Sequence, residues 1–552
     1  MAKPITENTL FYGDNLPILR EYLPDESIDL IYLDPPFNSN RTYNVLFKQE
    51  SGEDSEAQIA AFEDTWKWDR SAATTYQELI TQAPDDVVKM IGALYSFLGR
   101  NQMMAYLVMM AARLLELRRV LKPIGSIYLH CDPTASHYLK IVMDTIYGVQ
   151  NFRNEIVWMR TTSKSLMTRK LPDNHDVILV YQKTEQATWN INSIFVPYDL
   201  SQLDEKTAKK YTHRDSDGRL YQLTDLSNPN PDRPNLTYEF LGITKVWRWT
   251  KERMQAAYEA GLVVQPRPGA VPRYKRYLDE QRGKPFGDVW TDIPPINSQA
   301  AERLGYPTQK PIALLERIIQ ASSNPGDWVL DPFCGCGTSI AAAEKLERRW
   351  IGIDITHLSI ALQKYRLKEQ FPEASFKVIG EPTSIHGARQ LAEDDRFQFQ
   401  WWALSLIRAR PHGGDGSSKQ GKKGADKGID GIITFIDDHT GKPKRVIVQV
   451  KSGKVSSPLI SQLVGTINRE SAAIGIFLTL EEPTKDMRAE AISAGFYHSP
   501  GWNQDYPRIQ ILSVGGLLDG SARLEMPPAE FTTFKQAQRV KEEGPGQGKL
   551  FD

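Results

Sequence analysis

The chain has 552 residues, too many for one hydrophobic core, and its 41% hydrophobic and 24% charged residues are typical of a globular protein with about two to four domains. The formal net charge of −1 excludes a uniformly basic nucleic-acid-binding protein, so any contact with DNA must use local basic patches. Three cysteines are too few for a disulfide framework in a chain of this length, which favours a reducing compartment and a cytoplasmic location.

Strand and helix patterns alternate through the first part of the chain. The pattern predicts strands at 9–12, 28–33, 126–130 and 176–181, and helices at 15–22, 106–121 and 132–147. Repeated alternation of this kind is typical of a parallel sheet with helices on both faces. The most apolar stretch, 103–115, is too short to cross a bilayer, and no signal peptide follows Met1, so we expect no association with a membrane.

The alternation degrades between residues 183 and 299, where Pro, Asn, Asp, Arg and aromatic residues predominate. This composition predicts an irregular inserted module. Arginine and aromatic side chains suit contacts with phosphates, guanine edges and bases. We therefore expect the segment as a whole to recognise a DNA target. We assign no single role to any of its arginines, which are Arg214, Arg219, Arg248, Arg253, Arg267, Arg273 and Arg276.

The alternation returns after residue 310 and predicts helices at 311–322, 339–346 and 358–369 and strands at 328–330 and 350–353. A helix at 397–407 then precedes a Gly, Lys and Ser-rich stretch, 413–428, and further strands and helices from 431 to 494 complete a small α/β domain. The expected organisation has six parts: a first α/β half at 1–182, an insertion at 183–299, a second α/β half at 300–370, a linker at 371–395, a C-terminal domain at 396–525 and a tail at 526–552.

The stretch from Asp331 to Thr338, Asp-Pro-Phe-Cys-Gly-Cys-Gly-Thr, forms a predicted strand-to-helix turn. Gly335 and Gly337 would let the backbone approach a ligand closely, and Asp354 ends the next strand, where a carboxylate can accept hydrogen bonds from ribose hydroxyls. A glycine-rich turn alone also fits a dinucleotide site or a plain turn. A phosphate is disfavoured because Asp331 would repel it, whereas the carboxylate suits a cationic amino group.

A second acidic motif, Asp34-Pro35-Pro36-Phe37, closes the predicted strand 28–33. An exocyclic amine of a nucleobase is a poor nucleophile, and a catalyst can help by accepting its protons. Asp34 could accept one N–H and the carbonyl of Pro35 another, the two prolines would stiffen the loop, and Phe37 could stack on the base. The base would have to be flipped out of the duplex to reach such a pocket.

These motifs resemble those of S-adenosylmethionine-dependent DNA N6-adenine/N4-cytosine amino-methyltransferases of the permuted beta class, over most of residues 9–366. The resemblance implies a Rossmann-like α/β methyltransferase sheet in which the catalytic half precedes the cofactor half, and double-stranded DNA as substrate. It implies that S-adenosyl-L-methionine is held by Asp331, Phe333, Gly335 and Gly337 at its methionine end, with Thr308 and Lys310 beside it, Asp354 on the ribose and Asp14 at the adenine. An Asp at the start of the catalytic motif favours adenine as target base, with N4 of cytosine as the alternative.

Residues 397–520 resemble the Mrr-like branch of the PD-(D/E)xK restriction endonucleases. The resemblance carries Asp430, Gln449 and Lys451 over as catalytic residues, with Asp430 as a ligand of Mg²⁺. The first helix of that branch often presents a Glu, whereas this chain has Gln in the stretch Phe397-Gln398-Phe399-Gln400. Two hypotheses remain open: a Mg²⁺-dependent nuclease fused to its methyltransferase, or a degenerate DNA-binding domain. A third is a DNA-binding protein with two inactive catalytic folds, and a homodimer is compatible with any of them.

Overall fold

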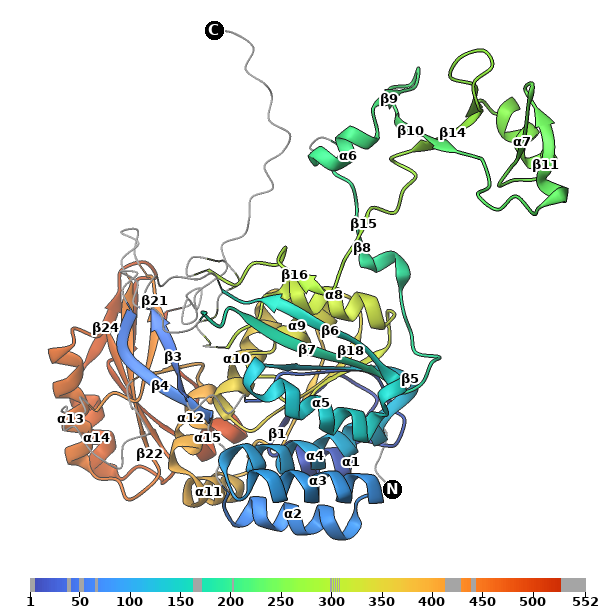
Figure 1. The fold of residues 1–552 in the computed structure, drawn as a ribbon. Helices are drawn as coiled ribbons and strands as arrows, with labels where there is room; N and C mark the ends of the chain where they lie inside the picture. Colours follow the sequence, from blue (N-terminus) through green and yellow to red (C-terminus); the bar gives the residue numbers. More distant parts are fainter. Residues whose placement is uncertain are drawn as a thin grey trace, which may run out of the picture. The chain divides into compact units, whose positions relative to one another are not determined.

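The computed structural model describes residues 5–36, 41–48, 54–64, 68–161, 171–200, 203–297, 300, 302, 304, 306, 308–412, 428–437 and 443–527. The chain divides into two compact units (Figure 1). One combines Met1–Trp189 with Asp288–Asp552, and the other is Asn190–Gly287. No helix among the described residues is long and apolar enough to span a membrane.

A nine-stranded sheet forms the centre of the first unit. Its order is β16 (Val289–Trp290), β6 (Phe152–Met159), β7 (His175–Gln182), β5 (Leu121–Cys131), β2 (Ile28–Leu33), β17 (Trp328–Asp331), β18 (Arg349–Asp354), β1 (Thr9–Tyr12) and β19 (Lys377–Ile379). β2 pairs with β17 in parallel, with Leu30 opposite Val329. Strands nearly three hundred residues apart in the sequence are therefore neighbours, and the permuted Rossmann-like sheet predicted from the sequence is confirmed.

One strand runs against the predicted parallel arrangement. β7 is antiparallel to both of its neighbours, β5 and β6, while the other neighbouring pairs are parallel. An antiparallel strand can follow its partner directly, whereas a parallel strand needs a crossover connection. The sequence of β7 is almost continuously buried, so its hydrophobic pattern contains no information about strand direction.

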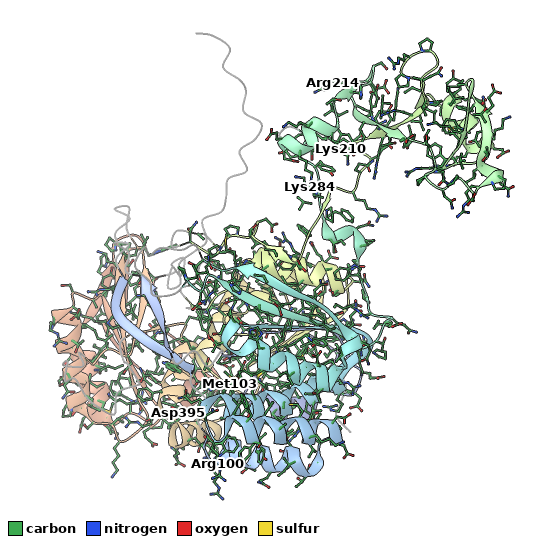
Figure 2. All side chains as sticks on the ribbon, in the orientation of Figure 1. Arg100, Met103, Lys210, Arg214, Lys284 and Asp395 are labelled. Atoms are coloured by element: carbon green, nitrogen blue, oxygen red, sulfur yellow. The ribbon has the colours of Figure 1, made fainter. Side chains whose placement is uncertain are left out.

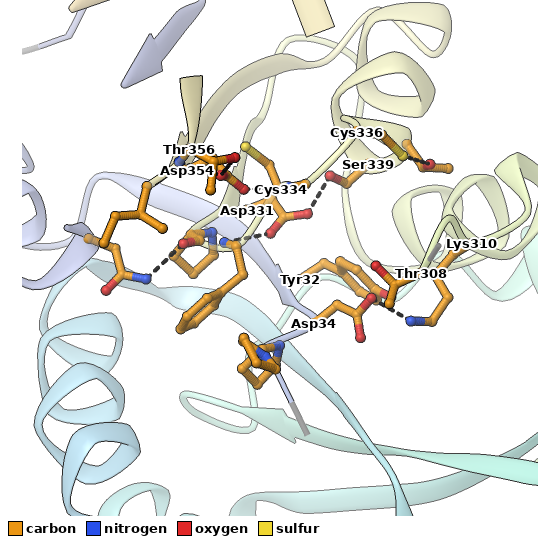
Figure 3. Close-up of a pocket in the computed structure, with 18 of the residues that line it drawn as sticks. Tyr32, Asp34, Thr308, Lys310, Asp331, Cys334, Cys336, Ser339, Asp354 and Thr356 are labelled. Carbon is orange, nitrogen blue, oxygen red and sulfur yellow. Dashed lines mark hydrogen bonds and ion pairs between the residues drawn. The ribbon is translucent and has the colours of Figure 1, made fainter. Parts of the chain in front are cut away.

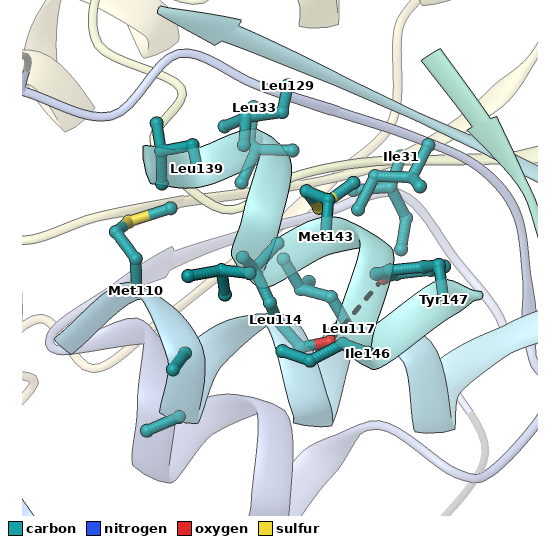
Figure 4. Close-up of a cluster of buried hydrophobic side chains, with 14 of the residues drawn as sticks. Ile31, Leu33, Met110, Leu114, Leu117, Leu129, Leu139, Met143, Ile146 and Tyr147 are labelled. Atoms are coloured by element: carbon teal, nitrogen blue, oxygen red, sulfur yellow. Dashed lines mark hydrogen bonds between the residues drawn. The ribbon is translucent and has the colours of Figure 1, made fainter. Parts of the chain in front are cut away.

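Helices cover both faces of this sheet. On one face α1 (Asn15–Tyr22), α4 (Gln102–Val120) and α5 (Pro133–Tyr147) pack against Ile31, Leu33 and Leu129 (Figure 4). Two helices that the sequence analysis did not identify, α2 (Arg70–Gln82) and α3 (Asp85–Leu98), pack against α4 and α5. On the other face α8 (Ile312–Ser322), α9 (Thr338–Lys345) and α10 (His357–Gln370) pack against Leu30 and Tyr32. Alternate residues of β2 thus enter two different cores, as in a sheet that is buried on both sides.

The C-terminal domain has its own five-stranded sheet, in the order β20 (Arg410–Pro411), β21 (Gly431–Phe435), β22 (Lys444–Lys451), β23 (Ile474–Thr479) and β26 (Ile509–Ser513). One face is covered by α11 (Ile385–Asp394), α12 (Arg396–Leu406) and α15 (Val514–Asp519), and the other by α13 (Ser457–Arg469) and α14 (Lys485–Ser493). A hairpin of β24 (Phe496–Ser499) and β25 (Gln504–Pro507) follows α14, and a second hairpin near the N-terminus pairs β3 (Arg41–Lys48) with β4 (Asp54–Asp64).

The unit Asn190–Gly287 is built from short elements. An antiparallel sheet has the order β13 (Val263–Val264), β14 (Arg273–Tyr277), β10 (Leu220–Asp225) and β9 (His213–Arg214). The remaining elements are η2 (Ile191–Ile194), β8 (Phe195–Val196), α6 (Glu205–Lys210), η3 (Pro234–Leu236), β11 (Thr237–Phe240), β12 (Ile243–Val246), α7 (Lys251–Glu259) and β15 (Lys284–Pro285). A separate small core around the fully buried Trp247 holds α7 and the β11–β12 hairpin together.

Candidate active site and nuclease-like domain

A pocket lies at the carboxyl ends of the adjacent strands β1, β2, β17 and β18 (Figure 3). Each of these strands ends in, or is followed by, an aspartate that lines the pocket; they are Asp14, Asp34, Asp331 and Asp354. Other predicted site residues also line it, namely Pro35, Pro36, Thr308, Lys310, Phe333 and Gly335. Open α/β sheets bind ligands at this edge, so the geometry defines a ligand site with a strongly acidic lining.

Asp331 is buried at the base of the glycine-rich turn. Its carboxylate accepts hydrogen bonds from the hydroxyl of Ser339 and, at 3.0 Å, from the backbone N–H of Phe333. Burial, together with the negative charges of Asp34 and Asp354, raises the pKa of Asp331 to about 7 in spite of these donors. A cationic group in the pocket would favour the ionised form of Asp331, so this position suits an ammonium group of a ligand.

Asp354 lies on the opposite wall of the turn. Its Oδ2 accepts a hydrogen bond from the N–H of Gly335 at 2.9 Å, and its Oδ1 accepts from both the N–H and the hydroxyl of Thr356, each at 2.9 Å. Burial raises the pKa of Asp354, and these donors act against the shift. The bonds fix the carboxylate with lone pairs still available for the hydroxyls of a ribose. The next residue, Ile355, lines the pocket with an exposed side chain that could contact an adenine ring.

Gly335 and Gly337 both adopt the left-handed backbone conformation, with φ of 49° and 73°. Gly335 lines the pocket, but Gly337 does not belong to its lining. A Cβ at position 337 would lie 2.6 Å from the side chain of Gln363. Gly337 is therefore required for the turn into α9 and for packing, because a larger residue would be strained there and would collide with Gln363.

Asp14 is paired with a buried arginine. Arg113 Nη2 lies 2.7 Å from Asp14 Oδ1, and Arg113 also donates to Asn15 Oδ1 at 2.5 Å. Asn15 in turn donates to the carbonyl of Pro332 at 2.8 Å, which connects β1 to the glycine-rich turn. Burial lowers the pKa of Arg113 and the charge of Asp14 opposes this effect. The sequence contained a signal for this residue, because a charged side chain inside an apolar helix usually has a partner.

Asp34 is paired with Lys310 across the pocket, with Lys310 Nζ 2.5 Å from Asp34 Oδ2. Both side chains are largely buried. The ion pair joins the two predicted halves of the site, since Asp34 follows β2 and Lys310 precedes α8. Phe37, which we expect to stack on a base, lies outside the described residues.

In the C-terminal domain, Asp430 lies just before β21 and beside β22, the strand that contains Gln449 and Lys451. The Asp430 carboxylate accepts a hydrogen bond from the N–H of Val450 at 2.7 Å, and Gln449 is buried. Among the residues that the structure describes there is no group of three or more His, Cys, Asp and Glu side chains that could hold a metal ion. A divalent cation needs several oxygen ligands, so this arrangement does not fit the predicted Mg²⁺ site.

Helix α12 of the C-terminal domain contacts the neighbourhood of the pocket. Gln398 on α12 accepts a hydrogen bond from the backbone N–H of His357 at 3.0 Å, and His357 directly follows the pocket residue Thr356. Trp401, also on α12, packs against a buried cluster that contains Tyr306 and Leu358. The two domains thus share an interface at the start of α10.

The permuted sheet and the acidic pocket define a Rossmann-like methyltransferase, followed by a restriction-endonuclease-like domain. A model of the DNA methylase family, N6_N4_Mtase, matches residues 28–362, and a model described as NACHT-associated inactive Restriction Endonuclease 1 matches residues 415–519. The first match covers more than half of the chain, which therefore belongs to the DNA methylase family. Both of the resemblances inferred from the sequence are confirmed.

Several known proteins are similar to this chain. The type II methyltransferase M.EcaI of Enterobacter cloacae is 29% identical over 356 residues, which are 63% of this chain and 67% of that protein. The DNA adenine methyltransferase YhdJ of Escherichia coli (strain K12) is 25% identical over 360 residues, 65% of this chain and 82% of YhdJ. Among solved structures, the cytosine-N4-specific PvuII DNA methyltransferase matches 69% of this chain and 99% of its own, with 13% identity and a TM-score of 0.31. The chain spans 67%, 50% and 61% of the first three curated relatives.

Proposed function

We propose that this chain transfers a methyl group from S-adenosyl-L-methionine to N6 of adenine in double-stranded DNA at a specific sequence. The observation that carries the proposal is the single pocket that contains both the glycine-rich turn with Asp331 and Asp354 and the Asp34-Pro35-Pro36 motif. When bound, the cofactor supplies an electrophilic methyl group on a sulfonium. The pocket residues fit it, because they offer carboxylates to its cationic groups and its ribose.

The residues of the chain would then divide the work as follows. Asp331 would bind the amino group of the methionine end, Asp354 the ribose, and Asp14, held by Arg113, the adenine side. Asp34 and the carbonyl of Pro35 would accept hydrogen bonds from the two N–H groups of the target amine, and the one proton that the nitrogen loses when it gains the methyl group would leave through Asp34 or directly to water. The two hydrogen bonds would draw electron density onto the nitrogen and hold it in line with the methyl group.

Adenine is preferred over cytosine for two reasons. The catalytic motif begins with Asp, as is typical of the adenine enzymes that it resembles, and the matched relative YhdJ is a DNA adenine methyltransferase. N4 of cytosine is the alternative, since its amine has the same two protons and would meet the same acceptors.

We assign sequence recognition to the unit Asn190–Gly287. Residues 190–287 contain 16 Lys and Arg and 12 Asp and Glu, a net charge of +4, whereas the whole chain carries −1. Lys210, Arg214 and Lys284 are exposed on this unit (Figure 2). Several of its basic residues lie over aromatic rings, for example Arg253 over Trp249 at 4.4 Å. A local positive charge of this kind is what binding to DNA phosphates requires in a chain that is almost neutral overall.

We propose that the C-terminal domain binds DNA without cutting it. Its first helix has glutamines where related nucleases often have a glutamate, and Gln398 is engaged by His357. The Asp430 carboxylate already accepts a backbone hydrogen bond, and the matching family model describes an inactive enzyme. The alternative is that the C-terminal domain cleaves DNA, and a single experiment tests methyl transfer and cleavage together.

The experiment incubates the purified chain with tritiated S-adenosylmethionine, Mg²⁺ and genomic DNA from a host without DNA methyltransferases. We expect tritium in the DNA, N6-methyladenine as the modified nucleoside in mass spectrometry, and intact DNA on a gel. Asp34→Ala should lower the rate of incorporation by at least about 100-fold, because the amine then has no side-chain acceptor.

The matched control is Asp86→Ala, which removes an exposed aspartate of α3 far from any predicted role. This variant should retain full activity. Absence of label with the unmodified chain would refute methyl transfer, N4-methylcytosine would refute the adenine assignment, and Mg²⁺-dependent cutting that Asp430→Ala abolishes would refute the non-cutting role.

A further inference from the structure

A chain of buried polar side chains crosses the sheet beneath Asp34. The hydroxyl of Tyr32 is 2.9 Å from His130 Nδ1, and His130 Nε2 is 3.2 Å from Asp176 Oδ2. Arg160 Nε lies 3.2 Å from the other carboxylate oxygen, Asp176 Oδ1. Tyr32, His130 and Asp176 come from the adjacent strands β2, β5 and β7 and are 2%, 0% and 2% exposed. None of these contacts belongs to the cofactor-binding or catalytic roles proposed for the pocket aspartates.

The charge of Asp176 fixes the direction of these hydrogen bonds. Burial acts to raise the pKa of Asp176, but the hydrogen bond from His130, the charge of His130 when it is protonated, and the nearby charges of Lys310 and Arg160 outweigh it and hold the pKa below its usual value. An ionised carboxylate can only accept, so His130 donates from Nε2. When its imidazole is neutral, His130 donates from Nε2 and has a lone pair on Nδ1, so the Tyr32 hydroxyl then donates its proton to Nδ1.

The Tyr32 proton is thereby directed away from the catalytic carboxylate. Tyr32 is the penultimate residue of β2 and Asp34 directly follows that strand, and both side chains line the pocket (Figure 3). After burial, the charge of Asp34 is the strongest influence that raises the pKa of Tyr32, so the phenol keeps its proton. Asp34 is therefore the carboxylate whose charge acts most strongly on this hydroxyl, and it is the acceptor that would compete with His130 for the proton.

A donor from Tyr32 would compete with the substrate. Lys310 already donates to Asp34 Oδ2. A second protein donor at this carboxylate would leave it less able to accept the N–H of the target amine, and a weaker acceptor would draw less electron density onto the nitrogen.

Building on the proposed function of Asp34, we propose that His130 and Asp176 are positioning residues that keep the Tyr32 hydroxyl turned away from Asp34, so that this carboxylate remains an acceptor for the target amine. His130 and Asp176 touch neither substrate nor cofactor in this role. They act through Tyr32, and the rival explanation is a buried polar chain that only stabilises the sheet.

The substitution Asp176→Asn reverses the chain of hydrogen bonds without changing its shape. Arg160 is a cation that forms an ion pair with Asp176 Oδ1, so the amide oxygen of the new side chain should face Arg160 and its NH₂ group should face His130 Nε2. Nε2 must then accept, the proton moves to Nδ1, and Nδ1 donates to Tyr32. Asp→Asn beside a catalytic histidine is known to select the wrong tautomer in this way. The Tyr32 proton is then free to turn to Asp34.

The test is a double-mutant cycle in the full chain, measured as single-turnover methylation of the same genomic DNA. We expect Asp176→Asn to lower the rate about 10- to 100-fold, the effect of one hydrogen bond to a charged group. Affinity for S-adenosylmethionine, measured by calorimetry, should stay within about twofold, since Asp176 is not among the pocket residues. Tyr32→Phe removes the competing hydroxyl and should stay within about threefold of the unmodified chain. It should also restore Asp176→Asn to within about threefold of Tyr32→Phe alone.

The matched control is Tyr128→Phe. Tyr128 lies opposite Tyr32 on β5, is equally buried at 2%, and hydrogen-bonds Ser322 at 2.6 Å outside the pocket. Tyr128→Phe measures how much the methylation rate falls when any buried tyrosine hydroxyl is lost. It should not restore the methylation rate of Asp176→Asn.

The outcomes separate the two proposals. Failure of the unmodified chain to methylate DNA refutes the proposed function. With methylation intact, a double variant no faster than Asp176→Asn refutes the positioning role and supports the purely stabilising one. If Asp176→Asn does not fold, Tyr32→Phe decides by itself, because a folded Tyr32→Phe variant that is more than about tenfold slower contradicts a hydroxyl that only has to be kept away.

Discussion

At the scale of single residues, the four aspartates of the site differ in the groups that balance their charge or donate hydrogen bonds to them. Asp34 and Asp14 are paired with cations, Lys310 and Arg113, whereas Asp331 and Asp354 are held by hydroxyl and backbone donors. The first pair of aspartates is thereby fixed in place and charge-balanced. Asp331 has a pKa of about 7, so a cationic ligand can change its ionisation in the physiological range.

We predict that affinity for S-adenosylmethionine rises with pH through the pKa of Asp331. Below a pH of about 7 the carboxyl group is protonated, and binding the ammonium of the ligand must displace that proton. The affinity should therefore fall by up to about tenfold for each pH unit below the pKa. Calorimetric titrations at several pH values in buffers of different ionisation enthalpy would measure both the affinity and the released proton.

Asp331→Asn should bind the cofactor weakly and with no such pH dependence. The matched control is Asp327→Asn, at the start of the same strand, whose pKa is also raised by burial but which does not line the pocket. A pH-independent affinity in the unmodified chain would contradict the role of Asp331.

The folding stability of the free chain depends on pH in the opposite direction. The raised pKa of Asp331 means that the folded chain holds the proton more tightly than the unfolded chain. The stabilisation that Asp331 contributes is therefore present at acid pH and is lost as the pH rises towards 7.

The sequence identified the acidic residues of the pocket but not their partners. Asp34, Asp331 and Asp354 were recognisable because each follows an apolar run of strand length, where a turn brings a polar side chain to the edge of a sheet. The pairing of Lys310 with Asp34 joins residues 276 positions apart, and the pairing of Arg113 with Asp14 joins residues 99 apart. Such contacts follow from the order of the strands, which local patterns do not determine.

At the scale of elements, α12 connects the two domains of the first unit. It follows α11 in the C-terminal domain, and its Gln398 satisfies the N–H of His357, the first residue of α10. The first N–H groups of a helix have no partner within the helix, so this bond removes one unsatisfied donor. The helix itself was predicted from the sequence, and its glutamines were noted as a departure from nucleases. Their use as a contact with the methyltransferase was not predictable from that pattern.

We predict that Gln398→Ala weakens binding of S-adenosylmethionine by about fivefold, the effect of one hydrogen bond worth about 1 kcal/mol. The bond steadies the start of α10, directly after Thr356, which holds Asp354. Calorimetry on the full chain measures the effect. Gln400→Ala, two residues further along the same helix, serves as control and should leave the affinity unchanged. Equal affinities for all three proteins would show that α12 does not support the cofactor site.

At the scale of the whole molecule, the sequence predicts an inserted module between the two halves of the methyltransferase. The module was expected at 183–299, and the compact unit observed is Asn190–Gly287. Residues before and after it still belong to the first unit: Thr188 donates to the carbonyl of Ile124, and β16 extends the large sheet beside β6. Strands as short as β16 have too few residues for a recognisable pattern, so the sequence does not show that residues 289–290 extend the large sheet.

The separate core of the unit Asn190–Gly287 leads to a prediction about the whole chain. Leu226, Phe240, Trp247, Met254 and Val263 form a cluster that contains only residues of this unit. None of the residues that line the cofactor pocket belongs to it. Replacing residues 190–287 by a flexible Gly/Ser linker should therefore leave the large sheet folded and the affinity for S-adenosylmethionine within about twofold.

The same excision should abolish site-specific methylation, because it removes the segment with a net charge of +4 that we expect to bind and read DNA. We expect the rate of tritium transfer to genomic DNA to fall by at least about 100-fold, while calorimetry still detects the cofactor. A variant of the full chain with Lys210→Glu and Arg214→Glu tests the same point without removing residues. Its DNA binding should be weakened most at low salt. An excised chain that methylates the same sites at an undiminished rate would place recognition elsewhere, and the C-terminal domain would become the next candidate for it.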